Sequence, residues 1–207
     1  MPGFRQTVAV IIAIAIFILG STIAAADSGK TAKQLPAGLP FAFGGPFELT
    51  NHLGKRVTDK DFHGRFALLY FGYTYCPNIC PVDLANMIDG LDALGKLGDK
   101  LTPVFVTVDP KRDTVKVLAD YVSNFHPRMV GLTGSEADIK KVAKAFRIHR
   151  VKVLLKDRPK DDYLVSHSSL FVLLDPKGTV QTLIPHGASP ERIQQVLQKY
   201  LSAKEHS

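Results

Sequence analysis

The sequence predicts an α/β fold in which a mixed central sheet is flanked by helices. Two observations support this class. Apolar strand-like runs alternate along the chain with amphipathic helix-like segments, and two such runs near the end are joined by a tight turn. The alternation favours parallel strands, while the tight turn requires an antiparallel pair in the same sheet. With 207 residues, 45% of them hydrophobic and 22% charged, the chain has the composition of one globular domain.

The N-terminal segment is predicted to direct the chain out of the cytoplasm. Residues 8–26 carry no charge, follow Arg5 and are about long enough to cross a bilayer. Three alanines precede Asp27 and fit a small-residue cleavage site. Residues 1–26 are therefore either a transmembrane anchor or a signal peptide, and both alternatives export the chain from Asp27 onward. Residues 27–46 are rich in Gly, Pro, Ala and Lys and are predicted to be a linker.

The domain is expected over residues 47–203. Residues 47–58 predict a hairpin with its turn at Asn51–Gly54, and residues 66–73 form the continuous apolar run of a central strand. Apolar residues then recur at helical spacing over residues 82–97. The later elements, recognised by apolar periodicity, are a strand at 101–109, a helix at 114–125, a strand at 129–134, a helix at 135–146, strands at 168–175 and 179–185, and a helix at 189–201.

Polar residues mark the beginnings of the last three helices. Asp113 or Thr114, then Ser135, and finally Ser189 followed by Pro190 supply the side chains that cap helix N-termini. The resulting order of elements is that of a thioredoxin-like fold with an N-terminal hairpin extension and an inserted strand–helix unit.

The only two cysteines, Cys76 and Cys80, lie in YFGYTYCPNICP, between a predicted strand and a predicted helix. This position places both sulfurs near the positive end of a helix dipole, which stabilises thiolates. Pro81 is expected at the first helical position, with Cys80 as the cap. A structural disulfide could persist after export, but closing so short a loop stabilises a domain little. A redox pair and a metal site are the remaining alternatives.

The surroundings of the cysteines bear on these alternatives. A thioredoxin-type redox site has two residues between its cysteines, usually after a tryptophan, whereas this chain has three and no Trp. Two sulfurs suit a soft ion such as Cu(I) or zinc, and a stable site needs a further ligand. Among the seven histidines, His167 directly precedes the strand predicted at 168–175. In a thioredoxin-like fold, the loop before that strand lies beside the N-terminus of the helix that follows the cysteines. Cys76, Cys80 and His167 are therefore candidate ligands, and spacing alone does not choose copper over zinc.

The charge of the chain gives a broader exclusion. The formal net charge is +7, but the lysines and arginines are scattered and form no block of five like charges. A solvated basic surface explains this pattern, and no nucleic-acid-binding motif accompanies it. Nucleic acid is therefore not among the predicted partners.

Several blocks together resemble the Sco/SenC family, which takes part in the assembly of cytochrome c oxidase. The resemblance covers residues 47–201 and is carried by YFGYTYCPNICP, VDPKRDT, YVSNFHPRMVGLTGS and DYLVSHSSLFVLLDPKG in matching order and spacing. Four blocks in order are much more specific than two cysteines alone.

The resemblance implies a copper metallochaperone rather than an enzyme. One copper ion per domain, Cu(I) or Cu(II), would be bound by Cys76, Cys80 and His167. It would be delivered to the CuA site of cytochrome c oxidase subunit II by a domain anchored to the inner membrane and lying in the periplasm. The alternative is a thiol–disulfide oxidoreductase that keeps the cysteines of that subunit reduced, with a reversible Cys76–Cys80 disulfide. Other copper chaperones or a thioredoxin-like reductant are the further partners implied.

Two positions depart from the family pattern. Tyr75 stands where many members have His, which removes a second imidazole beside Cys76. Ser166 stands where many have Asp, which removes a carboxylate next to His167. Such a carboxylate can orient a ligand histidine and raise its basicity, so its absence is expected to weaken metal retention or favour redox chemistry.

Overall fold

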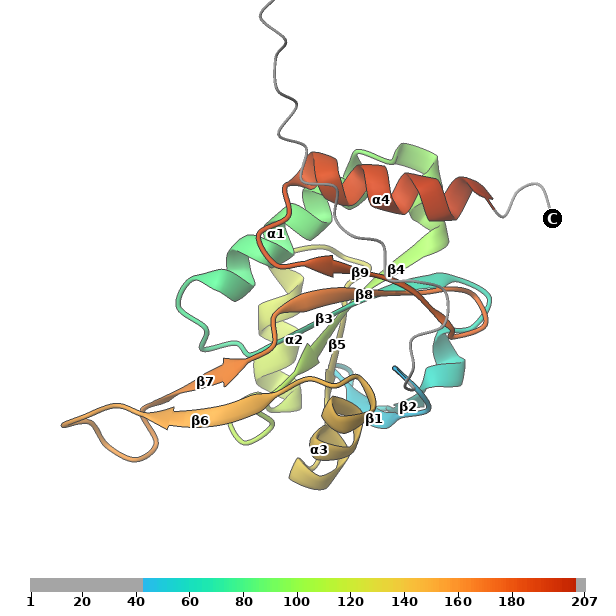
Figure 1. Ribbon diagram of the computed structural model, residues 1–207. Coiled ribbons are helices and arrows are strands. Elements are labelled where there is room, and N and C mark those ends of the chain that lie inside the picture. The colour runs from blue at the N-terminus through green and yellow to red at the C-terminus, as the bar shows by residue number, and fades with distance from the viewer. Residues whose placement is uncertain (1–42, 204–207) are drawn as a thin grey trace, which may run out of the picture. The chain divides into compact units, whose positions relative to one another are not determined.

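The computed structural model describes residues 43–203. The predicted anchor or signal segment, most of the linker at 27–46 and the tail from residue 204 lie outside the described residues. Across the described range, no helix combines the length and the apolar character needed to cross a bilayer. The described part is a sheet with helices on both faces (Figure 1), as the sequence predicts.

The main sheet has seven strands in the order β2-β1-β5-β4-β3-β8-β9. Strand β4 is parallel to both of its neighbours, β3 and β5, and every other pair in the sheet is antiparallel. The sheet is therefore mixed, as expected. Its strands are β1 (Glu48–Asn51), β2 (Arg56–Thr58), β3 (Phe66–Gly72), β4 (Leu101–Thr107), β5 (Val130–Thr133), β8 (Leu170–Leu174) and β9 (Val180–Pro185).

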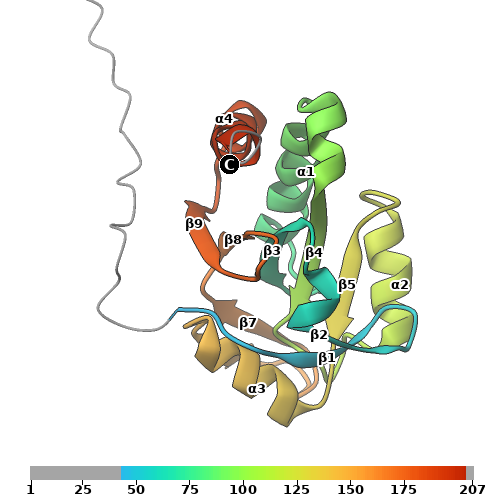
Figure 2. The ribbon, with the colours of Figure 1, turned by 90° about the vertical axis from the view of Figure 1, so that its right-hand side faces the viewer.

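Helices cover both faces of this sheet (Figure 2). On one face, Tyr70 of β3 and Phe105 of β4 lie side by side and contact the first two α-helices through Asp83 and Tyr121. On the other face, Phe71 packs on Phe146, at the end of the third helix. The helices are α1 (Ile79–Asp92), α2 (Val115–Ser123), α3 (Glu136–Ala145) and α4 (Pro190–Ala203), with short 3₁₀ helices at Asp59–Phe62 and Gly95–Lys100.

The N-terminal hairpin joins the main sheet. Strands β1 and β2 pair around a turn in which Gly54 takes a positive φ of 79°, a conformation that suits glycine. Strand β1 also pairs with β5, so the extension adds two strands to one side of the sheet. Just before it, Phe43 packs edge-on against Phe146 at 6.2 Å, and the Gly44 N–H donates to the Ala145 carbonyl. The end of the predicted linker thus lies against α3.

The caps predicted for the last three helices are present. Thr114, rather than Asp113, caps α2 by accepting a hydrogen bond from the Val117 N–H. Ser135 forms a reciprocal capping box with Asp138, and the Ser189 hydroxyl accepts from the Arg192 N–H.

The beginning of α1 differs from the prediction. The helix begins at Ile79 with Asn78 as its cap, so Cys80 lies within the first turn and Pro81 is the third helical residue. The first four N–H groups of a helix have no partner inside it, so a proline is tolerated anywhere in the first turn. The prediction that Cys80 caps the helix was therefore wrong. The far end was also placed too late, because the helix ends at Asp92 and a 3₁₀ segment follows.

A second sheet was missed by sequence analysis. Strands β6 (Arg150–Leu154) and β7 (Tyr163–His167) form an antiparallel two-stranded ribbon between α3 and β8, and Figure 1 shows it extending away from the main sheet. His167, which was predicted only to precede the next strand, is the last residue of β7. The strand after it begins only at Leu170, two residues later than predicted.

Candidate metal centre

The site begins at the end of β3, a central and fully buried strand. Gly72 is its last residue, and a Cβ there would lie 3.1 Å from the Cys80 sulfur and 2.9 Å from a ring carbon of Phe105. These separations are too short for a side chain, so the lack of one at Gly72 lets the Cys80 sulfur approach the backbone of the strand.

A buried carboxylate holds the turn that follows. Asp113 accepts hydrogen bonds from the Thr74 N–H at 3.1 Å, the Thr74 hydroxyl at 2.6 Å and the Thr107 hydroxyl at 2.5 Å. Burial raises the pKa of Asp113, and these hydrogen bonds oppose that shift by stabilising the charged form. Asp113 therefore fixes the path of the chain two residues before Cys76.

The two cysteines and His167 lie together although 87 residues separate Cys80 from His167. The Cys80 sulfur lies 3.7 Å from His167 Nε2, and the Cys80 N–H donates to the Cys76 sulfur at 3.3 Å. Cys80 is fully buried, Cys76 is half-buried, and both are free thiols. Of the two sulfurs, therefore, only that of Cys76 is accessible to solvent. Across residues 43–203, no three His, Cys, Asp or Glu side chains converge as a ready-made metal cluster.

The tautomer of His167 follows from its neighbour. Its Nδ1 lies 3.1 Å from the Ser168 carbonyl oxygen, which can only accept, so Nδ1 carries the proton. Nε2 is then the nitrogen with a free lone pair, and it is the one that faces Cys80. The Tyr73 ring meets the imidazole edge-on at 5.8 Å and fixes its plane.

The two thiols differ in acidity. Hydrogen bonding, chiefly from the Cys80 side chain and also from the backbone N–H groups of Cys80 and Asn78, lowers the pKa of Cys76 to about 4. The adjacent Cys76 sulfur, together with burial, raises the pKa of Cys80 well above its usual value. Cys76 is therefore the thiolate, and Cys80 carries the proton that the thiolate accepts as a hydrogen bond.

Cys80 is backed by a buried polar pair. The Tyr70 hydroxyl donates to Asp83 at 3.0 Å, and the other Asp83 oxygen accepts from the Gly187 N–H at 2.8 Å. Both Tyr70 and Asp83 are essentially inaccessible to solvent, and burial raises the pKa of Tyr70, so the phenol stays protonated. This pair connects α1, the buried side of Cys80 and the loop before α4.

A stack of side chains, here called the Arg112 clamp, joins the cysteine turn to the ribbon. The Arg112 guanidinium lies 3.8 Å from the ring centroid of Tyr163 in β7 and 4.7 Å from that of Tyr75. Arg112 also donates to Asp109 at 2.5 Å and to the Tyr163 carbonyl at 2.8 Å, and the Tyr163 hydroxyl donates to Asp109 at 2.9 Å. Because Tyr75 precedes Cys76 and β7 ends at His167, the clamp connects two of the three candidate ligands.

The sequence pointed to the three site residues but not to their surroundings. Asp113 was predicted only as a possible helix cap, and Tyr75 was noted only as a position that lacks an imidazole. The other departure, Ser166, is exposed on the outer face of β7. Met87 is fully buried in the core, and His52 Nδ1 accepts a hydrogen bond from the Gly131 N–H.

The fold and the site define a class: a thioredoxin-like domain with a thiol pair at its first helix and a histidine against the buried sulfur. The family description SCO1/SenC matches residues 37–202 of this chain. The chain therefore belongs to the SCO1/SenC family.

Curated relatives agree with this assignment. Protein sco1 of Schizosaccharomyces pombe is 42% identical over 158 residues, and the human mitochondrial SCO1 homolog is 42% identical over 159 residues. These alignments cover 76% and 74% of this chain but only 60% and 50% of the relatives. The chain thus matches little more than half the length of these relatives.

Solved structures also match. Arabidopsis thaliana ScoI with copper bound is 35% identical, with a TM-score of 0.71 over 80% of this chain and 100% of that one. Bradyrhizobium japonicum ScoI with copper bound is 40% identical, with a TM-score of 0.70 over 77% and 99%. BsSco, a member of the Sco family of cytochrome c oxidase assembly proteins in which a disulfide switch was identified, is 26% identical, with a TM-score of 0.61 over 81% and 96%.

Proposed function

We propose that this chain is a copper metallochaperone that binds one copper ion through Cys76, Cys80 and His167. It delivers the ion to the CuA site of cytochrome c oxidase subunit II during oxidase assembly. The observation that carries the proposal is the 3.7 Å approach of the Cys80 sulfur to the unprotonated Nε2 of His167. A nitrogen about 2.0 Å and a sulfur about 2.3 Å from one ion lie about 3.5 Å apart at a tetrahedral angle and about 3.7 Å apart at a trigonal one.

The donor set suits copper as cargo. Two thiolates and one imidazole are soft and borderline ligands that stabilise Cu(I). Copper would replace the proton on Cys80 and the hydrogen bonds that the Cys76 sulfur now accepts. The copper-bound relatives from Arabidopsis thaliana and Bradyrhizobium japonicum support copper over zinc.

Transfer would begin at Cys76. Cys80 is inaccessible to solvent, whereas Cys76 is half-buried and precedes the start of α1. A ligand of the receiving protein can therefore reach the ion from the side of Cys76, and three protein ligands leave a coordination position open for it. Exchanging ligands one at a time moves the ion without releasing it to solvent.

The test is Cu(I) binding by competition with a chromogenic chelator. The reduced chain is expected to bind one ion, and His167→Ala to lose more than about a hundredfold in affinity, since removal of a ligand exceeds the 10–100-fold cost of disturbing its support. His186→Ala is the matched control, because His186 is exposed and lies outside the site. Equal affinity in His167→Ala and His186→Ala would exclude the three-ligand site.

A second candidate function is thiol–disulfide exchange that keeps the cysteines of subunit II reduced. The low pKa of Cys76 favours it, and the disulfide switch of BsSco supports it. The Cys76 thiolate would attack the partner disulfide and displace one partner sulfur. Cys80, losing its proton, would then displace the other, leaving a Cys76–Cys80 disulfide and two partner thiols. Two electrons pass from the thiol pair to the partner. Because copper transfer would use the same two sulfurs, one molecule cannot carry out both reactions at once.

The two functions make different demands on His167. Reduction of a disulfide-bonded subunit II peptide should survive His167→Ala and be abolished by Cys76→Ser. Copper delivery should fail in both variants. A cycle of reductions would also require a thioredoxin-like reductant, and a cycle of deliveries another copper chaperone as donor.

The chain is further proposed to work outside the cytoplasm, with its domain in the periplasm and residues 1–26 as inner-membrane anchor or cleaved signal. The relatives that support a membrane-associated, exported location are mitochondrial proteins and a Bacillus anthracis lipoprotein of the SCO1/SenC family. Mass spectrometry of the mature chain distinguishes the alternatives, because a chain that starts at Asp27 has no anchor.

A further inference from the structure

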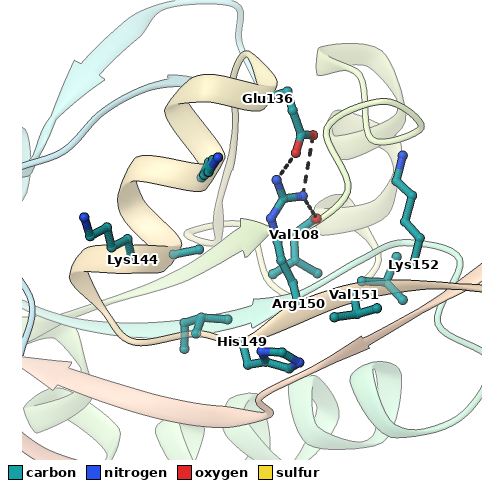
Figure 3. Close-up of a pocket in the computed structure, with 11 residues that line it drawn as sticks. Val108, Glu136, Lys144, His149, Arg150, Val151 and Lys152 are labelled. Atoms are coloured by element: carbon teal, nitrogen blue, oxygen red, sulfur yellow. Dashed lines mark hydrogen bonds and ion pairs between the residues drawn. The ribbon is translucent and has the colours of Figure 1, made fainter.

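A groove of about 570 Å³ lies between α3 and β6, and Figure 3 shows the side chains around it. We call it the α3–β6 groove. Helix α3 borders one side and the first residues of β6 the other, while β7 lies on the opposite side of β6 (Figures 1 and 3). The lining combines apolar side chains with charged and polar ones. The apolar ones are Val108, Ala143, Ile148, Val151 and Val165, and the others are Glu136, Lys140, Lys144, His149, Arg150 and Lys152.

The rim is positively charged. Arg150 pairs with Glu136 and donates to the Val108 carbonyl at 2.8 Å, so the one carboxylate of the groove is already neutralised. Lys140, Lys144 and Lys152 remain, and within residues 43–203 none of them forms an ion pair, although the Lys152 ammonium lies 4.7 Å from the ring centroid of Tyr163. Three unpaired positive charges around one concave surface concentrate a positive potential there.

The groove also borders an open strand edge. Among the strands of residues 43–203, β6 pairs only with β7. The Ser168 N–H donates to the His149 carbonyl at 2.9 Å, and backbone groups alternate between the two sides of an antiparallel strand. The N–H and C=O groups of Arg150, Lys152 and Leu154 therefore point away from β7, toward the open edge. Such a row of groups is a template for one more strand.

The side chains of β6 indicate what kind of strand could pair with its free edge. Arg150 and Lys152 stand on one face of the ribbon, and Val151 and Val153 stand on the other, where they are 48% and 41% exposed. Arg150, Lys152 and Val151 all reach the groove. Neighbouring residues of paired strands share a face. An added strand thus meets positive charge on one face and exposed apolar surface on the other. A second copy of β6 would bring arginine and lysine against arginine and lysine and is disfavoured.

We propose that the α3–β6 groove binds an extended acidic segment of a partner protein, which adds as a strand to the free edge of β6. Acidic residues of the segment alternate with apolar ones, the acids facing Lys140, Lys144 and Lys152 and the apolar residues covering Val151 and Val153. The inference does not depend on metal binding. It does place the partner beside the ribbon whose other strand ends at His167.

The probe is a fluorescein-labelled seven-residue peptide that alternates Glu or Asp with Val or Thr, added to the purified full-length chain and followed by fluorescence anisotropy. Saturable binding is expected, weakened at least tenfold by the double substitution Lys140→Glu, Lys144→Glu. The matched control is Lys177→Glu, Lys199→Glu, which changes the net charge equally at exposed sites outside the groove. An equal loss of peptide affinity in both double variants would mean that net charge alone attracts the peptide, and this would overturn the proposed binding at the α3–β6 groove.

A second measurement tests the strand. N-methylation of every second peptide residue should abolish binding for the set of N–H groups that faces β6 and spare it for the other set. Hydrogen exchange at Arg150, Lys152 and Leu154 should slow by more than tenfold when the unmodified peptide is bound. Binding without this protection overturns strand addition. Vesicles containing phosphatidylglycerol are the third probe: if they bind through Lys140 and Lys144 while the peptide does not, the groove serves a lipid surface and the proposal fails.

Discussion

Replacing Tyr75 by alanine removes one of the three tyrosine rings that surround the Arg112 guanidinium; the ring centroids of Tyr163 and Tyr73 remain 3.8 Å and 5.7 Å from it. The other contacts of Arg112, with Asp109 and with the ring and carbonyl of Tyr163, are left in place. The cysteine turn then loses its closer ring contact with Arg112, and only the contacts of Tyr73 with Arg112 and His167 still join this segment to β7 through aromatic rings. The variant should therefore bind copper more weakly, because the arrangement that brings Cys76 toward His167 is populated less of the time.

The magnitude follows from the geometry. The guanidinium lies 4.7 Å from the Tyr75 ring centroid, and Tyr75 is 59% exposed. A cation–π contact at an exposed site contributes about 0.5–1 kcal/mol. With about 1.4 kcal/mol for each tenfold change, Cu(I) affinity should fall roughly two- to fivefold.

Competition with a Cu(I) chelator at fixed pH measures this change, with Tyr75→Phe as the control that keeps the ring. Tyr75→Phe should stay within a factor of about two of the unaltered chain, since the ring face supplies the contact. An unaltered affinity in Tyr75→Ala, or an equal loss in Tyr75→Phe, would refute the role given to the clamp.

Three further predictions concern the thiol pair and its support. Because the pKa of Cys76 is lowered to about 4, the rate of its alkylation by iodoacetamide should fall less than twofold between pH 8 and pH 6. An ordinary thiol, such as those of the urea-unfolded chain, should slow roughly a hundredfold over the same range. A hundredfold loss of rate in the folded chain would contradict the assignment of Cys76 as a thiolate. Gly72→Ala places a Cβ about 3 Å from Cys80 and Phe105 and should lower the free energy of unfolding in urea by about 1–3 kcal/mol. An unchanged midpoint of urea unfolding would show that β3 can shift to fit the added methyl group without loss of stability. Asp83→Ala leaves the Tyr70 hydroxyl and the Gly187 N–H without their hydrogen-bond partner and should lower the free energy of unfolding by about 2–4 kcal/mol. Asp89→Ala, at an exposed position of the same helix, should lower it by less than about 0.5 kcal/mol. Similar losses in both variants would show that the buried pair does not stabilise the fold.

The sequence was most informative where local patterns determine structure. Continuous apolar runs identified the buried strands β3, β4 and β8, and the 3.6-residue period with capping side chains identified the helices. Short-range chemistry also placed the two cysteines at the start of a helix. Such features depend on neighbours along the chain, which the sequence displays directly.

The β6–β7 ribbon was missed although its pattern is present. The segment RVKVL alternates charged and apolar residues, and YLVSH follows after a loop that contains Pro159 and several charged residues. Alternation over five residues is a weak signal, and four of the five residues of β6 are exposed, so no hydrophobic face set it apart from a surface loop.

The supports of the site could not be read from the sequence for a different reason. The Arg112 clamp joins Tyr75, Arg112 and Tyr163, which lie on three separate elements and form no spacing pattern. The same holds for Tyr70, Asp83 and Gly187 behind Cys80. Only the fold brings these groups together, and each of them alone has an ordinary explanation as a core, capping or surface residue.

The proposal that Cys76, Cys80 and His167 hold one copper ion is tested most directly by X-ray absorption at the copper edge of the Cu(I)-loaded chain. Two sulfur ligands and one nitrogen ligand are expected, with the nitrogen lost and both sulfurs retained in His167→Ala. A copper ion bound by sulfur alone in the unaltered chain, or a nitrogen ligand that persists in His167→Ala, would contradict the three-ligand site.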